Sequence, residues 1–461
     1  MELRLTDGTT TVTLSGTDAL LRRYTPQAPD LDTVRHDRAL GDGGEQPVTM
    51  YRNVTEEASV ALEGTLAEQR ATLAAVNRLF GQARQRQRNG MGDRVYVEFQ
   101  PVSAETWYRS EVLAGRVMMD GDVRAGIQLA GEQLLLTLVW TRRYYWEGAL
   151  TELVLGNDID GDYYTDGVTV RNDGDNWADI DGDYYTAGVT GDLPAPLRLD
   201  MTNSLNEATF HLAWVWIAHN VHSNPAALSH HLEAEGATGG TTQVQASCSG
   251  GEYQQFTWAT DIEELAFTWE LDSALLAAAA GNWFQIMARF FNPAVPHVYW
   301  YRLALYHETV ALWQGPLAQP DANFATNTRS LGAVQLPPWL VETSSAPLDL
   351  RLYVYNPGGG TLNLDYLQLL PTDSFAVLRQ VGYPVRYGET LVWDGTEDRL
   401  YTLTSEGRAG NFTRLGSPAV MLEPGRDQRL YFLQHTWMAN TAEVNRTLDV
   451  RAYYRPRRLV L

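Results

Sequence analysis

Most of the chain consists of short segments in which apolar and polar residues alternate, and this pattern limits the fold more than any other feature. A period of two gives a strand one apolar face, and Gly, Pro and Asn separate the segments. The clearest segments are Val48 to Val54, Arg94 to Gln100, Trp107 to Met119, Thr209 to Ala218, Trp283 to Phe290, Val298 to Leu305, Leu348 to Tyr355, Thr361 to Leu369 and Arg446 to Arg455. We therefore predict an all-β chain built from sandwiches.

One segment has helical periodicity instead. Between Thr65 and Arg88 the apolar positions that recur near 3.6-residue spacing are Leu66, Leu73, Val76, Leu79 and Phe80. Thr65 can cap the first turn with Glu68 three positions on, and Asn89-Gly90 ends the pattern. The sequence predicts one prominent amphipathic helix on a β-domain.

The length of 461 residues exceeds what one hydrophobic core supports, so several domains are expected. The predicted segments are residues 1–150, residues 151–196 with an Asp/Gly-rich repeat and a linker, a jelly roll at 197–371, and residues 372–461. The last segment is short for a separate sandwich. One interpretation is that it shares sheets with residues 150–200, which would make the jelly roll an insertion.

The formal net charge of −21 argues against a surface for nucleic acid or anionic membrane. Cys248 is the single cysteine, which excludes an intramolecular disulfide and a cysteine-based zinc site. The N-terminal residues lack the pattern of a signal peptide, and no apolar run approaches the ~20 residues that span a bilayer. We expect a soluble protein without membrane insertion, made in the cytoplasm.

Short motifs near both ends resemble a known family. They are Gly92-Asp93-Arg94-Val95-Tyr96-Val97-Glu98, Thr106-Trp107-Tyr108-Arg109-Ser110, Gly115-Arg116-Val117, Tyr144-Tyr145-Trp146-Glu147, Gly416-Ser417-Pro418, Leu422-Glu423-Pro424-Gly425 and Tyr453-Tyr454-Arg455-Pro456-Arg457-Arg458. The chain resembles the distal tail proteins of siphophages and related tail-tip components in these blocks. In addition, Leu364 to Pro371 resembles the closing strand of carbohydrate-binding modules.

The resemblance implies a structural protein of the virion. It implies that residues 1–150 form a tail-tube-like domain and that the chain assembles with itself into a ring, expected to be a hexamer. It further implies that the ring joins the tail tube to tail-tip or baseplate proteins. No catalytic residue, cofactor or metal is predicted, because the sequence holds no GxSxG, HExxH, phosphate-binding loop or dinucleotide motif.

Two motifs, one acidic and one containing histidines, are candidate metal sites. Asp158-Ile159-Asp160-Gly161-Asp162 recurs at residues 179–183, and closely spaced carboxylates suit Ca²⁺. However, the glycine is fourth and Thr169 stands twelfth, unlike an EF-hand loop, so two surface turns are favoured over a metal site. His230-His231 is expected in a solvated loop, because adjacent side chains of a strand point to opposite faces.

The central segment places aromatic and arginine side chains on one face of its predicted strands. Trp300 and Arg302 alternate in one strand, and Arg351 and Tyr353 alternate in another. Such a surface suits a host cell-surface glycan, because a ring packs on apolar C–H groups while polar side chains select hydroxyls. An ordinary sandwich gives the same pattern. Two other functions stay open: a glycan-binding host-adhesion protein, and a tail-associated glycoside hydrolase, which would need two carboxylates ~5 to 10 Å apart.

Overall fold

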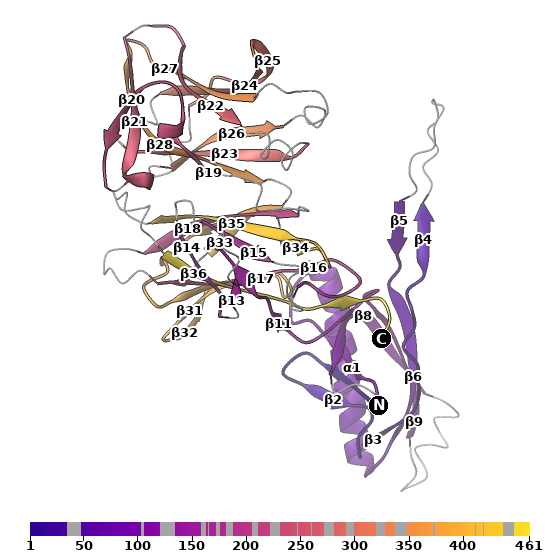
Figure 1. Ribbon diagram of the computed structural model, residues 1–461. Helices are drawn as coiled ribbons and strands as arrows, with labels where there is room; N and C mark the ends of the chain where they lie inside the picture. The colour runs from indigo at the N-terminus through magenta and orange to yellow at the C-terminus, as the bar shows by residue number, and fades with distance from the viewer. Residues whose placement is uncertain are drawn as a thin grey trace, which may run out of the picture. The chain divides into compact units, whose positions relative to one another are not determined.

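The computed structural model describes most of the chain (Figure 1). The described residues are 1–34, 48–102, 106–119, 134–157, 163–164, 166–171, 176–180, 188–204, 211–221, 231–246, 248–259, 261–271, 281–291, 299–319, 328–336, 348–371, 374–410, 412–417, 419–436 and 447–461. The predicted class is confirmed, because these residues form β-strands throughout with one long α-helix. Contacts divide the chain into two compact units. Unit 1 contains residues 1–151, 191–193 and 455–461, and unit 2 contains residues 152–190 and 194–454.

The helix α1, Leu66–Asn89, belongs to unit 1 and confirms the predicted helix. Thr65 and Glu68 form the capping box, and Gly90 ends the helix in the left-handed conformation with φ of 67°. Val76, Leu79 and Phe80 are buried as the spacing predicts, whereas Leu66 is 47% exposed. Leu66 is the first residue of the helix, and its side chain is not among those that pack in the core of unit 1.

The main sheet of unit 1 packs one face on α1 (Figure 1). Its order is β2–β1–β7–β8–β9–β6–β3, with the bounds β2 Thr11–Thr13, β1 Glu2–Thr6, β7 Tyr96–Gln100, β8 Tyr108–Met119, β9 Leu134–Arg142, β6 Val54–Leu62 and β3 Ala19–Tyr24. Gly115 of β8 allows the closest approach to the helix, because a Cβ atom there would overlap the ring of Phe80.

The C-terminal residues of the chain complete unit 1. Strand β37, Arg457–Arg458, pairs with β10, Trp146–Glu147, and β10 in turn pairs with β8. The buried Glu147 carboxylate binds both Arg109, at 3.2 Å, and Arg457, at 3.3 Å. Residues 146–147 and 457–458, which belong to two motifs of the resemblance, therefore pair in unit 1.

A two-stranded arm extends from the same unit (Figure 1). It consists of β4, Leu31–Val34, and β5, Val48–Tyr51, which pair with each other and with no other described strand. Arg52 binds Asp32 across the arm at 2.7 Å.

The first sandwich of unit 2 combines distant parts of the sequence. One sheet, here named the β36 sheet, contains β11 Thr151–Glu152, β14 Val168–Arg171, β17 Arg198–Asn203, β30 Thr390–Asp394, β31 Arg399–Thr404, β32 Gly407–Ala409 and β36 Thr447–Tyr454. The other, the β35 sheet, contains β12 Leu155–Gly156, β13 Tyr163–Tyr164, β15 Trp177–Ile180, β18 Leu212–Val221, β29 Ser374–Gln380, β33 Phe412–Gly416 and β35 Gln428–Thr436. A short pair, β16 Ala195–Pro196 and β34 Met421–Leu422, closes one end.

The second sandwich is inserted between β18 and β29, and its first described strand starts at residue 231, so the predicted start at residue 197 is wrong. Residues 198–221 lie outside it because β17 and β18 pair with strands of the first sandwich. Its β28 sheet contains β19 His231–Glu233, β20 Thr241–Val244, β21 Glu252–Trp258, β23 Trp283–Phe290, β26 Thr328–Gln335 and β28 Gly360–Pro371. Its β27 sheet contains β22 Glu264–Leu271, β24 Trp300–His307, β25 Val310–Gln314 and β27 Leu348–Tyr355.

The four sheets of unit 2 form one stack (Figure 1). A separate apolar cluster joins the β35 sheet to the β28 sheet and includes Trp216, Tyr431, Met287 and Tyr366. The β36 sheet and the β27 sheet are thus the two outer layers, and the outward face of the β27 sheet, here called the β27 face, carries the predicted glycan-binding residues.

Candidate functional site

The β27 face contains all four residues singled out from the sequence. Trp300 lies opposite Tyr355 in the register of β24 and β27, and Arg302 lies opposite Tyr353. Arg351 follows on the same side of β27, since burial along this strand alternates without interruption. The residues between them, Leu303, Leu305, Leu352 and Val354, are buried in the core of the sandwich. Glycan binding itself remains a prediction.

Arg302 is held at the centre of the β27 face by three neighbours. Its Nε donates to Oε1 of Glu263 at 2.7 Å, and its Nη1 donates to Oε1 of Gln314 at 3.1 Å. The guanidinium also lies 4.8 Å from the ring centroid of Tyr353. These contacts fix a donor and two acceptor groups side by side at a surface that water reaches.

Arg351 is occupied by a different set of contacts. Its guanidinium lies 3.9 Å from the ring centroid of Tyr306 and donates to Asp349 at 2.8 Å. Tyr353 in turn donates to the hydroxyl of Tyr306 at 3.4 Å, and burial together with this hydrogen bond raises the pKa of Tyr353. Arg351 therefore contacts Tyr306 and Asp349 within the face, and its predicted role in glycan binding stays a prediction.

The apolar part of the β27 face lies at one end. Trp300 is 38% exposed and Leu265 of β22 is 42% exposed, while Tyr355 and Tyr353 are half-buried between them. The sequence does not reveal Leu265 or the acceptor Glu263 as parts of this face, because strand pairing and a contact 39 residues away bring them there.

The opposite outer layer of unit 2 provides a comparison. On the β36 sheet, Arg198 binds Asp200 at 2.9 Å and lies 5.4 Å from the ring centroid of Tyr453. Arginine, tyrosine and carboxylate groups therefore cover both outer sheets, and this combination alone does not define a site. What sets the β27 face apart is Trp300, since no aromatic side chain on the described strands of the β36 sheet is as exposed.

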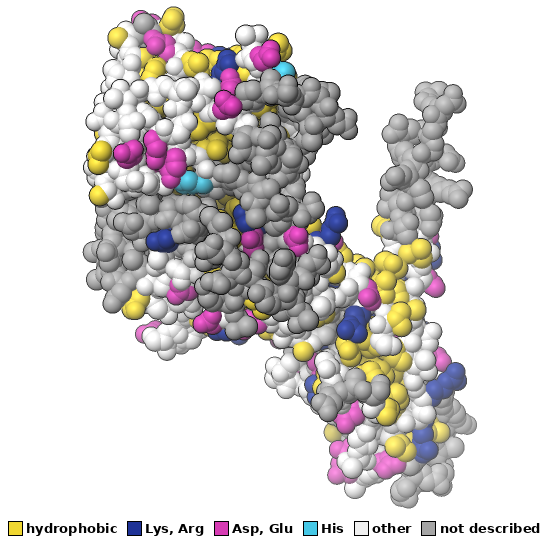
Figure 2. Space-filling model, in the orientation of Figure 1, with side chains coloured by type: hydrophobic (Ala, Val, Ile, Leu, Met, Phe, Trp, Pro, Cys, Tyr) yellow, Lys and Arg dark blue, Asp and Glu magenta, His cyan; other side chains and the backbone are white. Residues whose placement is uncertain are grey.

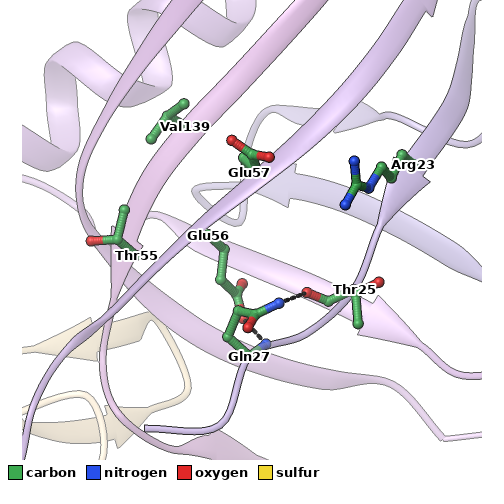
Figure 3. Close-up of a pocket in the computed structure, with 7 residues that line it drawn as sticks. All are labelled: Arg23, Thr25, Gln27, Thr55, Glu56, Glu57 and Val139. Carbon is green, nitrogen blue, oxygen red and sulfur yellow. Dashed lines mark hydrogen bonds between the residues drawn. The ribbon is translucent and has the colours of Figure 1, made fainter. Parts of the chain in front are cut away.

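A hollow of about 300 Å³ lies at the root of the arm in unit 1 (Figure 3). It is lined by Arg23, Thr25, Gln27, Thr55, Glu56, Glu57 and Val139. The Glu56 carboxylate accepts hydrogen bonds from Tyr24, the Gln27 amide and Arg142, so its oxygens are already used. Glu56 and Glu57 are neighbours on one strand and point to opposite faces, which prevents them from acting as paired catalytic carboxylates.

His231 lies in a partly buried polar cluster, so the expected solvated loop is wrong for this residue. It starts β19, its Nδ1 lies 2.9 Å from Oε1 of Gln368, and its Nε2 lies 3.1 Å from Oε1 of Glu233. Ser249 joins the cluster through a hydrogen bond to Glu233. Long-range pairing of β19 with β28 brings these groups together, and no local pattern reveals it.

The Asp-Ile-Asp-Gly-Asp repeats, including the carboxylates considered for calcium, lie mostly outside the described residues. Asp179, which begins the second copy, lies in β15 and accepts a hydrogen bond from Nη2 of Arg429 at 2.8 Å. Within the described part of the chain, no three His, Cys, Asp or Glu side chains are arranged to hold a metal ion. No helix among those residues is long and apolar enough to cross a membrane.

Comparisons with known proteins give weak structural likenesses only. No family model and no curated protein matches the sequence. The Dit protein of phage SPP1, described as a paradigm of the hub adsorption apparatus, is 8% identical, with a TM-score of 0.32 over 99% of this chain and 98% of that chain. A protein of the activated phage p2 baseplate with Sr is 10% identical, with a TM-score of 0.27 over 76% of this chain and 97% of that chain. These scores are too low to establish a common fold.

Proposed function

We propose that the chain is a structural component of a phage tail tip, similar to distal tail proteins. In this proposal, copies of unit 1 form a ring between the tail tube and the tail-tip or baseplate proteins, and unit 2 presents a binding sandwich. The resemblance in residues 93–147 and at the C-terminus supports this class. The pairing of β10 with β37, which brings Trp146-Glu147 next to Arg457-Arg458, is consistent with this proposal.

The arm is the observation that carries the assembly. An isolated two-stranded sheet is at best marginally stable in water, so an arm that persists needs a surface to pack on. Leu31 and Met50 of the arm are 56% and 54% exposed. The register places Leu31 and Met50 on opposite faces of the arm, so a neighbouring copy that packs on either face would bury an exposed apolar side chain.

The sheet of unit 1 offers apolar surface for such contacts. Leu135, Ala61 and Leu20 lie opposite one another across β9, β6 and β3, on the face turned away from α1. Leu135 and Leu20 are 47% and 39% exposed. Figure 2 shows hydrophobic side chains gathered along unit 1 below the arm. Apolar patches of this kind often mark protein contacts.

The ring is tested by native mass spectrometry and negative-stain electron microscopy of the full chain. We expect a closed oligomer of six 51.5 kDa copies. The arm variant Leu31→Asp with Met50→Asp should dissociate it, because it places one charge on each face of the arm, whichever face the neighbouring copy covers. Leu415→Asp, which alters a 57% exposed residue of unit 2, is the matched control. A wild-type chain that stays monomeric at high concentration and at every salt concentration would contradict the ring.

The second sandwich is proposed to bind glycan on the host surface through the β27 face. Exposed Trp300 beside the Arg302–Glu263 pair favours this over a purely structural sandwich. We propose no enzymatic activity for the chain. Incubation with host cell-wall polysaccharide should therefore release no reducing sugar, and release that depends on a single carboxylate would favour the hydrolase alternative.

A further inference from the structure

We propose that the β27 face binds an uncharged polysaccharide, an inference that rests on the proposed role of the second sandwich as a binding module. Trp300 and Tyr355 form the surface on which a sugar ring stacks. Arg302 and Glu263 bind its hydroxyl groups.

The stacking surface follows from the strand order β22–β27–β24. Trp300 of β24 lies directly opposite Tyr355 of β27, whereas Leu265 of β22 lies opposite Tyr353, in the row that contains Arg302. Because neighbouring strands lie about 4.8 Å apart, Trp300 and Tyr355 place two aromatic side chains next to each other. Trp300 keeps 38% of its surface exposed, and the face of an aromatic ring suits the C–H surface of a sugar ring.

The polar side chains are arranged before any ligand arrives. Arg302 bridges Glu263 and Gln314, and Gln314 Nε2 donates to the hydroxyl of Tyr306 at 2.9 Å. The side chains of Arg302 and Glu263 keep 23% and 25% of their surface exposed. A carboxylate and a guanidinium held next to each other can accept from one hydroxyl and donate to its neighbour. Little side-chain freedom is lost on binding, which favours affinity.

The charges of the face select against anionic polymers. Arg302 is paired with Glu263, and Arg351 is paired with Asp349. The exposed Glu270 lies opposite Asp349 on the neighbouring strand and makes the local balance negative. The whole chain carries a formal charge of −21. A polymer with phosphate or carboxylate groups would be repelled, whereas an uncharged one would not.

The test uses the full chain in native gels that contain a polysaccharide. The uncharged probes are dextran, mannan, galactan and hydroxyethyl cellulose, and polygalacturonic acid is the anionic probe. We expect retardation by at least one uncharged probe, with little change on raising the salt concentration, because no net charge is neutralised. Trp300→Ala should weaken this binding at least tenfold, and Glu263→Gln should weaken it several-fold.

Tyr453→Ala on the β36 sheet is the matched control, because it removes a half-buried tyrosine beside an arginine from the opposite outer layer. It should leave binding unchanged.

Thermal unfolding of each variant shows whether binding is lost because the protein unfolds. If Trp300→Ala unfolds the chain, Glu263→Gln still tests the site, because glutamine has nearly the same shape as glutamate. Salt-sensitive binding to polygalacturonic acid alone would overturn the ligand class but keep the binding module. Binding that survives both substitutions would overturn the site, and no binding to any probe would overturn the module. The ring is decided separately by the oligomer measurements.

Discussion

Nη2 of Arg142 lies 2.8 Å from Oε1 of Glu56, and neither side chain has any solvent exposure. The pair joins β9 to β6 beneath the root of the arm. Arg142 also donates to the carbonyl of Gln27, and the Gln27 amide donates to Glu56, so the segment leading to the arm is tied to the same pair. The direction in which the arm leaves unit 1 therefore depends on a buried charge pair.

Glu56→Gln should destabilise unit 1 by about 3 kcal/mol, because it leaves the buried Arg142 without its counter-charge. Urea unfolding measures the change. The exposed pair Arg451–Glu152 supplies the control, since Glu152→Gln should cost less than about 1 kcal/mol. The double variant Glu56→Leu with Arg142→Met should lose less unfolding free energy than the sum of the losses in the single variants Glu56→Leu and Arg142→Met, because it leaves no unpaired buried charge. Equal losses of unfolding free energy in Glu56→Gln and Glu152→Gln would show that the Arg142–Glu56 pair does not stabilise unit 1 at the root of the arm.

Two glycines near the helix of unit 1 should respond in opposite directions to alanine. Gly115→Ala places a Cβ atom in the ring of Phe80 and should cost about 1 to 3 kcal/mol through overpacking. Gly81 lies inside α1 with open space around its Cα, so Gly81→Ala should stabilise by about 0.5 to 1 kcal/mol through helix propensity. Thermal unfolding of both variants gives the signs. A neutral Gly115→Ala would mean that α1 packs farther from β8.

Local patterns predict the elements of this chain well and their partners poorly. The capping signals of Thr65 and Glu68 define the start of α1, since a cap depends only on residues three positions apart. Strand pairing is different, because β17 pairs with β30 and β36, which follow about 190 and 250 residues later. No periodicity records which strands meet, and the prediction of a jelly roll from residue 197 failed at this step.

The candidate site shows the same division. Alternation places Trp300 and Arg302 on one side of β24, because every second residue of a strand faces the same way. The partners of Arg302 are Glu263 and Gln314, which lie before β22 and in β25. A bulge in each neighbouring pairing shifts the register, so simple counting along the sequence does not find them.

Acidification should destabilise unit 2 through His219. This residue of β18 is buried, and burial lowers its pKa to about 4, although its ring bonds Gln428. The unfolded chain takes up a proton near pH 6.5 and the folded chain does not, so the stabilisation is present above pH 6.5 and is lost as the pH falls toward 4. Between pH 7 and 5 the loss should be about 2 kcal/mol.

The variant His219→Gln isolates this contribution. Urea unfolding of both proteins across this pH range should show the wild type losing more stability than the variant, since other groups titrate equally in both. Parallel losses would mean that His219 becomes protonated in the folded chain or is exposed to water.

Cys248 should be almost inert in the folded protein. It is 3% exposed beside the 3-10 turn of Ser249–Gly251, and burial raises the pKa of its thiol to about 11. Because the thiolate is the reactive form, labelling at pH 8 should be at least about a hundredfold slower than for an ordinary cysteine. Labelling with iodoacetamide, followed by intact mass, measures the rate in buffer and in urea. In buffer, the labelling reagent reaches Cys248 only when the second sandwich opens. The labelling rate therefore also reports the stability of that sandwich. Fast labelling of a chain that keeps its fold would show that the turn at Ser249 opens by itself.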